Sequence, residues 1–190
     1  MAVEPTEPPA DAPRSTGIAL AATVFYSLLA AGGWFWLSSR GRLAELPAAT
    51  GGSVGLPISM AIGIAVGLGL SACFALLVRY LGVFRRLVHG LAELLGPTSQ
   101  TDLFVLSSIA PVAEEFFFRL AVQDAWGLVP AALLYAALHI SPRAAWLCCG
   151  VGLILGLLFG WLVAMGCGLL AATAAHALFN YLTLLQTERL

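Results

Sequence analysis

The chain has 190 residues, of which 60% are hydrophobic and only 10% are charged. Soluble domains carry about 25% charged residues, so this chain has too little polar surface to cover a water-soluble globule. Its formal net charge of -1, with nine basic residues, also excludes the basic face that a nucleic-acid-binding protein needs. The composition therefore predicts an all-α, polytopic membrane helix bundle that has lipid, and no nucleic acid, as a partner.

The N-terminal part of the sequence contains two segments of different character. Residues 1–15 combine proline with acidic side chains and cannot bury an apolar face, so we expect a disordered tail there. The tail lacks the basic start that is typical of a cleaved signal peptide. The apolar run 17–37 has the length of a spanning helix and ends in Trp34 and Trp36, which favours a first transmembrane helix.

A second hydrophobic segment follows a stretch rich in small residues. The stretch PAATGGS is predicted to be a loop, and it leads to an apolar run over 56–80. Within that run, Gly63 and Gly67 form a GxxxG spacing, which favours the close approach of another helix. Residues 82–96 place apolar side chains at helical spacing and arginines at the other positions, so they predict an amphipathic helix at the membrane surface. We expect 16–98 to form an N-terminal transmembrane hairpin with this interfacial helix.

Residues 99–187 are expected to form a second helix bundle. Four more apolar helices are predicted, at 102–123, 127–141, 144–166 and 168–186. The second of them is short for a complete span, so we expect it to be tilted or covered by protein at one end. The prediction is therefore about six transmembrane helices plus one interfacial helix.

Ionisable and amide side chains are few in these last helices, and each charge costs roughly 2.5–3.5 kcal/mol to insert. The candidates are Glu114, Glu115, Arg119, His139, His176 and Asn180. Glu115 and Arg119 are four residues apart, so they share a helix face and can form an ion pair. Glu114 points about 100° away around the helix, so its partner must come from another helix.

A carboxylate, two imidazoles and a carboxamide on three helices suit the hydrolysis of an amide. A glutamate in apolar surroundings can act as general base on water, while imidazole and amide groups stabilise the oxyanion. The same groups can alternatively hold zinc, although an HExxH motif is absent. A third alternative is a non-enzymatic partner or proton-relay protein, in which the polar groups only join helices. If these groups converge around a water-accessible cavity, hydrolysis is favoured over the non-enzymatic alternative.

The three polar motifs resemble those of the CAAX-protease and bacteriocin-processing family of intramembrane endopeptidases, called CPBP or Abi. That family shows EExxxR, an aromatic residue four positions before a His, and His-xxx-Asn or Asp on successive helices. The matching segments are Glu114-Glu115-FFF-Arg119, Tyr135-AAL-His139 and His176-ALF-Asn180. The resemblance covers roughly residues 100–186. Two positions differ from the family's usual pattern: Leu120 replaces Gly, and Tyr135 replaces the more common Phe.

The resemblance implies a glutamic-type intramembrane endopeptidase that cleaves a peptide bond of a membrane-associated protein or peptide. It implies that Glu114 is the catalytic base, that His139 positions the water, and that His176 and Asn180 form the oxyanion site. It further implies that Glu115, Arg119 and Tyr135 support this arrangement. We expect no cofactor and no metal, with zinc as the alternative, and a multi-pass position in a bacterial inner membrane. Lipidated C-termini, bacteriocin-like peptides and C-terminal sorting signals all stay open as substrates.

Overall fold

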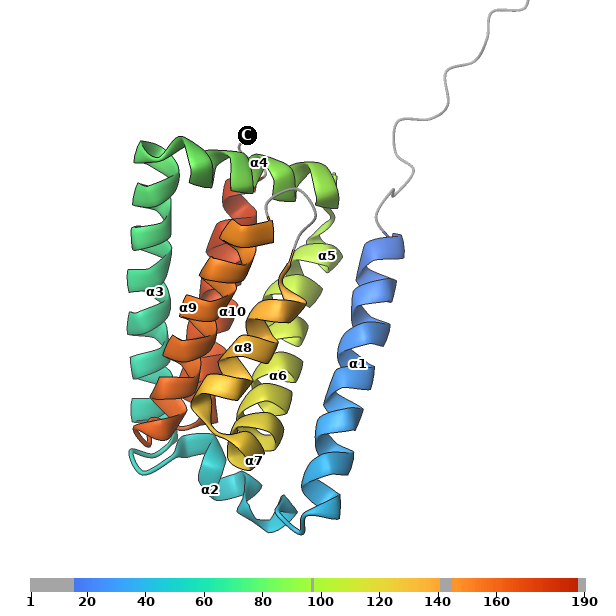
Figure 1. Cartoon of the computed structure of the whole chain (residues 1–190), viewed down its shortest axis with the longest axis vertical. Helices are drawn as coiled ribbons and strands as arrows, with labels where there is room; N and C mark the ends of the chain where they lie inside the picture. The colour runs from blue at the N-terminus through green and yellow to red at the C-terminus, as the bar shows by residue number, and fades with distance from the viewer. Residues whose placement is uncertain (1–15, 97, 141–144, 188–190) are drawn as a thin grey trace, which may run out of the picture.

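The structure is a computed structural model that describes residues 16–96, 98–140 and 145–187. The predicted tail 1–15 lies outside the described residues. The described residues are almost entirely helical, and most of the helices run side by side in one bundle (Figure 1). The predicted all-α bundle is confirmed, since no strand occurs in the described part of the chain.

The helices follow the apolar runs of the sequence closely. In chain order they are α1 Thr16–Ser39, the 3-10 helix η1 Leu43–Glu45, α2 Leu46–Gly51, α3 Leu56–Tyr80, α4 Gly82–Leu95, α5 Gln100–Phe104, the π-helix η2 Val105–Ile109, α6 Ala110–Glu115, the π-helix η3 Phe116–Gln123, α7 Asp124–Trp126, α8 Leu128–Leu138, α9 Ala145–Ala164 and α10 Leu169–Thr187. Segments α5 to α7 follow one another without a break, and we call them the 100–126 stretch.

Four helices in the described part of the chain, α1, α3, α9 and α10, are long and apolar enough to cross a membrane. The chain is therefore an integral membrane protein. The other two predicted spans differ from these four. Helix α8 has only 11 residues, and the 100–126 stretch contains buried charged side chains. The count of six spans thus stays a prediction.

The segment predicted as a loop after the first span contains a short helix instead. Residues 46–51 form α2, so the prediction of a loop over PAATGGS was wrong for most of that stretch. Pro47 lies in the first helical turn, where its missing N–H needs no partner. The alanines after it favour helix, and a glycine with positive φ, Gly52, ends it.

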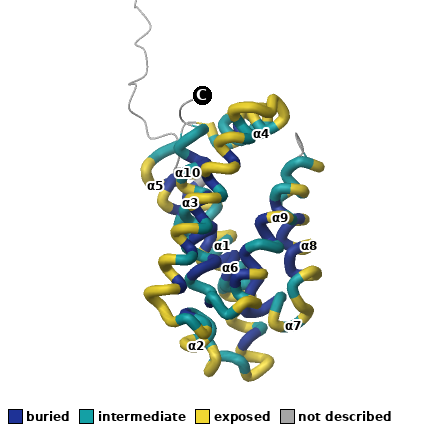
Figure 2. The backbone as a smooth tube through the Cα atoms, turned by 90° about the vertical axis from the view of Figure 1, so that its left-hand side faces the viewer, coloured by how far each residue is buried: buried dark blue, intermediate teal, exposed yellow. Residues whose placement is uncertain are grey.

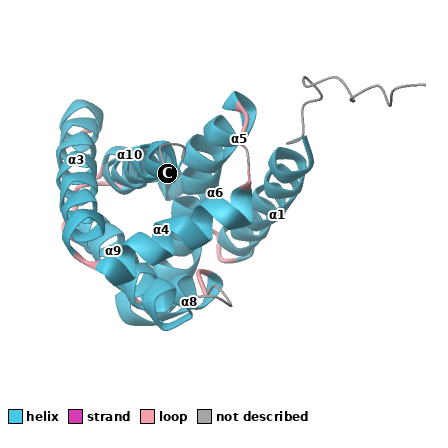
Figure 3. Ribbon diagram, turned by 90° about the horizontal axis from the view of Figure 1, so that it is seen from above, coloured by secondary structure: helices cyan, strands magenta, loops and turns pink. Residues whose placement is uncertain are grey.

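Helices α3 and α10 pack closely, as the GxxxG spacing predicts. A Cβ atom at Gly63 would lie 2.6 Å from the carbonyl oxygen of Ala171, and one at Gly67 would lie 2.9 Å from that of Ala175. Only glycine allows the two backbones to come so near. Figure 3 shows α3 beside α10, with α4 lying across the end of the bundle.

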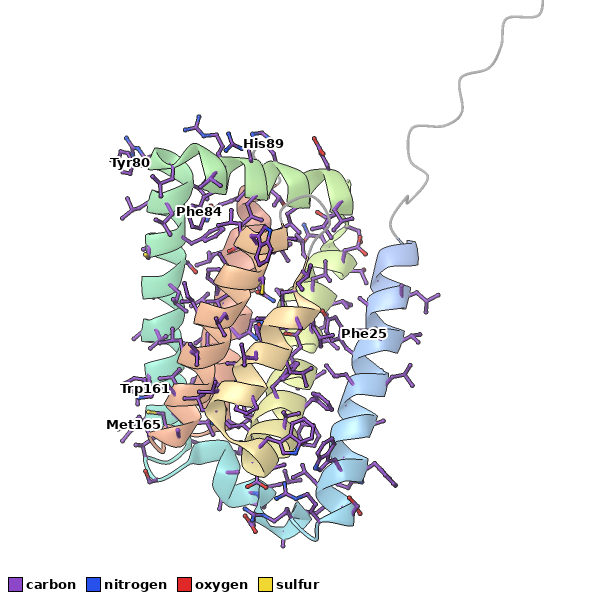
Figure 4. All side chains as sticks on the ribbon, in the orientation of Figure 1. Phe25, Tyr80, Phe84, His89, Trp161 and Met165 are labelled. Carbon is purple, nitrogen blue, oxygen red and sulfur yellow. The ribbon has the colours of Figure 1, made fainter. Side chains whose placement is uncertain are left out.

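The amphipathic helix α4 covers one end of the bundle, as expected for an interfacial helix. Its apolar side points into the bundle, where Val88 is buried and Phe84 packs edge-on against Phe74 with ring centroids 5.8 Å apart. His89 lies on the outer side of the helix (Figure 4). This arrangement separates the apolar and polar faces as membrane-surface helices do.

At the opposite end, ion pairs tie α1 to the 100–126 stretch. Arg40 and Arg42 contact the Asp124 carboxylate at 2.8 Å and 2.9 Å, and Trp36 packs edge-on against Trp126. Buried residues concentrate in the middle of the bundle, around α6, α8 and α9 (Figure 2). The polar motifs lie in this buried region.

Candidate active site

The buried ion pair predicted from sequence spacing is present. Arg119 Nε donates to Glu115 Oε2 at 2.7 Å, and the side chains of both residues are fully buried. The other oxygen of Glu115 accepts a hydrogen bond of 2.9 Å from His176 Nδ1. Glu115 therefore connects the first and third motifs, which come from α6 and α10.

Tyr135 completes the surroundings of His176. Its hydroxyl lies 3.3 Å from His176 Nε2, and both side chains are almost completely buried. Phe159 of α9 stacks on the His176 ring at a centroid distance of 5.0 Å, and the Arg119 guanidinium lies over the Tyr135 ring. The imidazole is thus held on both nitrogens and on one face.

Glu114 has its nearest polar neighbours on other helices, as the sequence predicts. Its Oε2 atom lies 3.7 Å from Nε2 of His139 on α8 and 4.0 Å from Nε2 of His176 on α10. The side chain is 8% exposed, and this buried oxygen accepts no hydrogen bond from the described residues. A buried carboxylate oxygen without a donor is unusual, and it can accept a hydrogen bond from a water molecule or a substrate.

His139 lies at the C-terminal end of α8, where its side chain is 35% exposed. Its Nδ1 donates to the Tyr135 carbonyl oxygen at 2.8 Å, and its ring stacks on the Tyr135 ring. Because a carbonyl only accepts, Nδ1 carries a proton, and Nε2 is the ring nitrogen that faces Glu114. The partial exposure of His139 leaves one side of the site open to the surface of the bundle.

Three glycines in α9 make room for these side chains. Gly152, Gly156 and Gly160 are four residues apart, so they form one stripe along the helix. A Cβ atom on them would lie 3.2 Å from Cβ of His139, 3.2 Å from Cδ1 of Tyr135 and 2.8 Å from Nη1 of Arg119, respectively. This glycine stripe therefore determines how closely α9 approaches the motifs.

Asn180 lies one turn after His176, and its amide donates to the Leu106 carbonyl at 3.2 Å. That carbonyl has lost its helical partners, because the Ala110 N–H is bonded to Val105 and the next residue, Pro111, has no N–H. Asn180 therefore satisfies a carbonyl that the π-helix leaves free. An amide has a second N–H, which this bond does not use.

Two residues of this region are not among the sequence predictions. Gln123 accepts from Arg119 Nη1 at 3.4 Å and donates to the Gly160 carbonyl at 2.9 Å, so it extends the buried network to α9. Tyr26, on α1, interacts with the Glu114 carboxylate. A tyrosine in the middle of an otherwise apolar span is a signal that could have identified the second of them.

No group of three or more His, Cys, Asp or Glu side chains within 16–96, 98–140 and 145–187 is arranged to hold a metal ion. The Glu115 carboxylate and His176 Nδ1 are already engaged with each other. Glu114 Oε2 and the Nε2 atoms of His139 and His176 then remain as possible ligands. The two nitrogens lie 3.7 Å and 4.0 Å from that oxygen. A zinc site would require these side chains to move closer together.

Comparison with known proteins identifies the C-terminal half of the chain. Residues 97–182 match the family of Rce1-like type II CAAX prenyl endopeptidases, and this segment contains all three polar motifs. No curated protein and no solved structure gives a match. The family consists of peptide hydrolases, which decides against the non-enzymatic alternative. The segment 97–182 is therefore similar to the Rce1-like type II CAAX prenyl endopeptidases, and the chain is a membrane-bound peptide hydrolase.

Proposed function

We propose that this endopeptidase uses a glutamic mechanism, in which Glu114 activates water for attack on a peptide bond. One observation carries the proposal. The Glu114 carboxylate, His139 and His176 come from three helices, and both Nε2 atoms lie within 4.0 Å of the same carboxylate oxygen. That oxygen is buried and accepts no hydrogen bond from the described residues, as a general base awaiting its water would.

The position of the water follows from the hydrogen bonds of His139. With its proton on Nδ1, His139 offers a lone pair at Nε2, and the ionised Glu114 also offers only acceptors. A water molecule that donates one proton to each group satisfies both and directs an oxygen lone pair outward. Attack of this oxygen on the carbonyl transfers a proton to Glu114, which then passes it to the leaving amine.

His176 and Asn180 are proposed to stabilise the oxyanion. Glu115 holds Nδ1 of His176, so a protonated ring directs its second N–H from Nε2 toward the space beside Glu114. One N–H of the Asn180 amide donates to the Leu106 carbonyl, which orients the amide. The second N–H of the same amide is then available to the oxyanion. Two donors of this kind commonly stabilise the tetrahedral intermediate of acyl transfer.

The balance of buried charge supports a protonated His176. The site contains two carboxylates, Glu114 and Glu115, and one buried guanidinium, Arg119. Burying an unbalanced charge is unfavourable, and a cationic imidazole between the two carboxylates removes the excess negative charge. Before a substrate binds, the hydroxyl of Tyr135 can accept from the Nε2 N–H of that imidazole, and the oxyanion then replaces the hydroxyl as the acceptor.

The substrate is a membrane-associated protein or peptide. The small, loop-poor helical bundle supports the proposed residence in a bacterial inner membrane. A lipidated C-terminus, a bacteriocin-like peptide and a sorting signal would all reach such a site from the lipid. Zinc bound by Glu114, His139 and His176 is the alternative mechanism, and it makes an opposite prediction about chelators.

The experiment is proteolysis of a membrane peptide by purified protein in detergent, with the Glu114→Gln variant as the comparison. Gln preserves size and shape but cannot take up a proton, so kcat should fall by about 10²–10⁴-fold while the melting temperature is unchanged. Activity of the wild type should survive a strong chelator. Loss of activity with chelator and its return with zinc would establish the metal mechanism, and full activity of E114Q would refute the site.

A further inference from the structure

Helix α1 lies outside the segment that matches the family, yet one of its faces packs against the helix that contains Glu114. Among the α1 residues whose burial the structure describes, Ala19, Gly33 and Leu37 are buried, and Tyr26 falls midway between the first two at intervals of seven residues. Residues seven apart lie on the same face of a helix. A Cβ at Gly33 would lie 3.0 Å from the Phe116 ring and 3.3 Å from the backbone of Phe117, so this face is in close contact with the 100–126 stretch.

An open groove separates α1 from the 100–126 stretch beside this contact. It has a volume of about 730 Å³, and Tyr26, Ala31, Val112 and Ala113 are among the residues that line it. None of the described residues that line it is charged. Ala113 directly precedes Glu114, and Tyr26 interacts with the Glu114 carboxylate. Tyr26 thus lines the groove next to Ala113, the residue that precedes the proposed general base.

We propose that Tyr26 is a positioning residue of the active site, whose hydroxyl donates to the Glu114 carboxylate and holds it so that Oε2 stays free for the attacking water. This inference rests on the proposed role of Glu114. A carboxylate has two oxygens and a rotatable side chain, and a donor on one oxygen restricts where the other points. His139 and His176 approach Oε2 from other helices, at 3.7 Å and 4.0 Å, and neither is within hydrogen-bond distance.

The arrangement explains why a tyrosine is needed rather than a phenylalanine. A phenol in an apolar span is unfavourable unless its hydroxyl has a partner. The ion pairs of Arg40 and Arg42 with Asp124 connect the end of α1 to the 100–126 stretch, so the position of α1 relative to Glu114 is fixed. The N-terminal helix therefore contributes directly to the geometry of a site whose motifs all lie in 97–182.

The test is the Tyr26→Phe variant, which removes one oxygen and preserves the ring that lines the groove. We expect kcat to fall roughly ten- to a hundredfold, as for the loss of a hydrogen bond to a charged group, with KM and the melting temperature unchanged. Tyr80→Phe is the matched control, because the Tyr80 ring is 70% exposed at the end of α3. It should leave kcat, KM and stability at the wild-type values.

Separate outcomes distinguish this inference from the proposed mechanism. Wild-type kcat in Y26F, together with an inactive E114Q, would overturn the role of Tyr26 alone, and full activity of E114Q would refute the mechanism itself. An increase in KM without a change in kcat would assign Tyr26 to substrate binding and contradict positioning. If Y26F lowers the melting temperature, a double-mutant cycle with E114A on the free energy of unfolding decides. Non-additive changes in this free energy support the contact between Tyr26 and Glu114, and additive changes refute it.

Discussion

The close approach of α8 and α9 can be tested with one added methyl group. In Gly156→Ala, the new Cβ would lie 3.2 Å from both Cα of Ala132 and Cδ1 of Tyr135, which is tighter than ordinary van der Waals contact. Helix α8 must therefore move by a few tenths of an ångström. Overpacking of this kind costs about 1–3 kcal/mol, and the higher helix propensity of alanine offsets about 1 kcal/mol. We expect a net loss of roughly 1 kcal/mol in the free energy of unfolding.

The same movement should reduce catalysis. Tyr135 and His139 both belong to α8 or its end, so a displaced α8 shifts them relative to Glu114 on α6. A misplacement of 1 Å can cost about a hundredfold in rate, so a shift of a few tenths should lower kcat roughly three- to tenfold. Turnover of a membrane peptide and thermal unfolding in the same detergent measure the two effects.

Gly150→Ala in the same helix provides the matched control. A Cβ at Gly150 would have no atom within 4 Å, so this variant gains helix propensity without a clash. It should be as stable as the wild type or more stable, with the same kcat. If G156A matched G150A in both unfolding and turnover, the argument that the glycine stripe positions the site would be wrong.

Two further predictions concern the buried polar network. Arg119→Met removes one of the two cations proposed to balance the buried Glu114 and Glu115, so the free energy of unfolding should fall by about 3–5 kcal/mol, and the double variant E115Q/R119M should recover part of it. A loss below about 1 kcal/mol on denaturant unfolding would contradict the ion pair. Asn180→Leu removes the donor to the Leu106 carbonyl, and we expect a loss of about 1–3 kcal/mol together with lower turnover. Unchanged stability in N180L would show that the carbonyl has another donor.

Most of the helices could be predicted from the sequence because their boundaries depend on local composition. The run 56–80 coincides with α3, and the run predicted over 17–37 corresponds to α1. The 102–123 run could be recognised as helical, but its division by π-helices could not. The π-helix before Pro111 depends on Asn180, a donor 74 positions away from Leu106, and no local pattern contains that information.

The candidate site shows the same division between local and distant contacts. The pair of Glu115 with Arg119 follows from a spacing of four residues, so the sequence was sufficient to predict it. The bond between Glu115 and His176 joins residues 61 positions apart, and the motif pattern could indicate only that the two belong to one site. Gln123 and Tyr26 were missed because each has a polar partner or neighbour that only the packing of helices reveals.

The glycine content of the chain and its buried charges have a common physical cause. In lipid, helices gain little from burying apolar surface against one another, so close packing and polar contacts must hold the bundle together. Gly63 and Gly67 bring α3 onto α10, the helix that contains His176, while the α9 stripe brings α9 against Tyr135, His139 and Arg119. Helices that approach so closely leave little room for lipid or bulk water around the charged groups, so those groups must satisfy one another. Glu114 Oε2 accepts no hydrogen bond from the described residues, so this oxygen is available for the reaction.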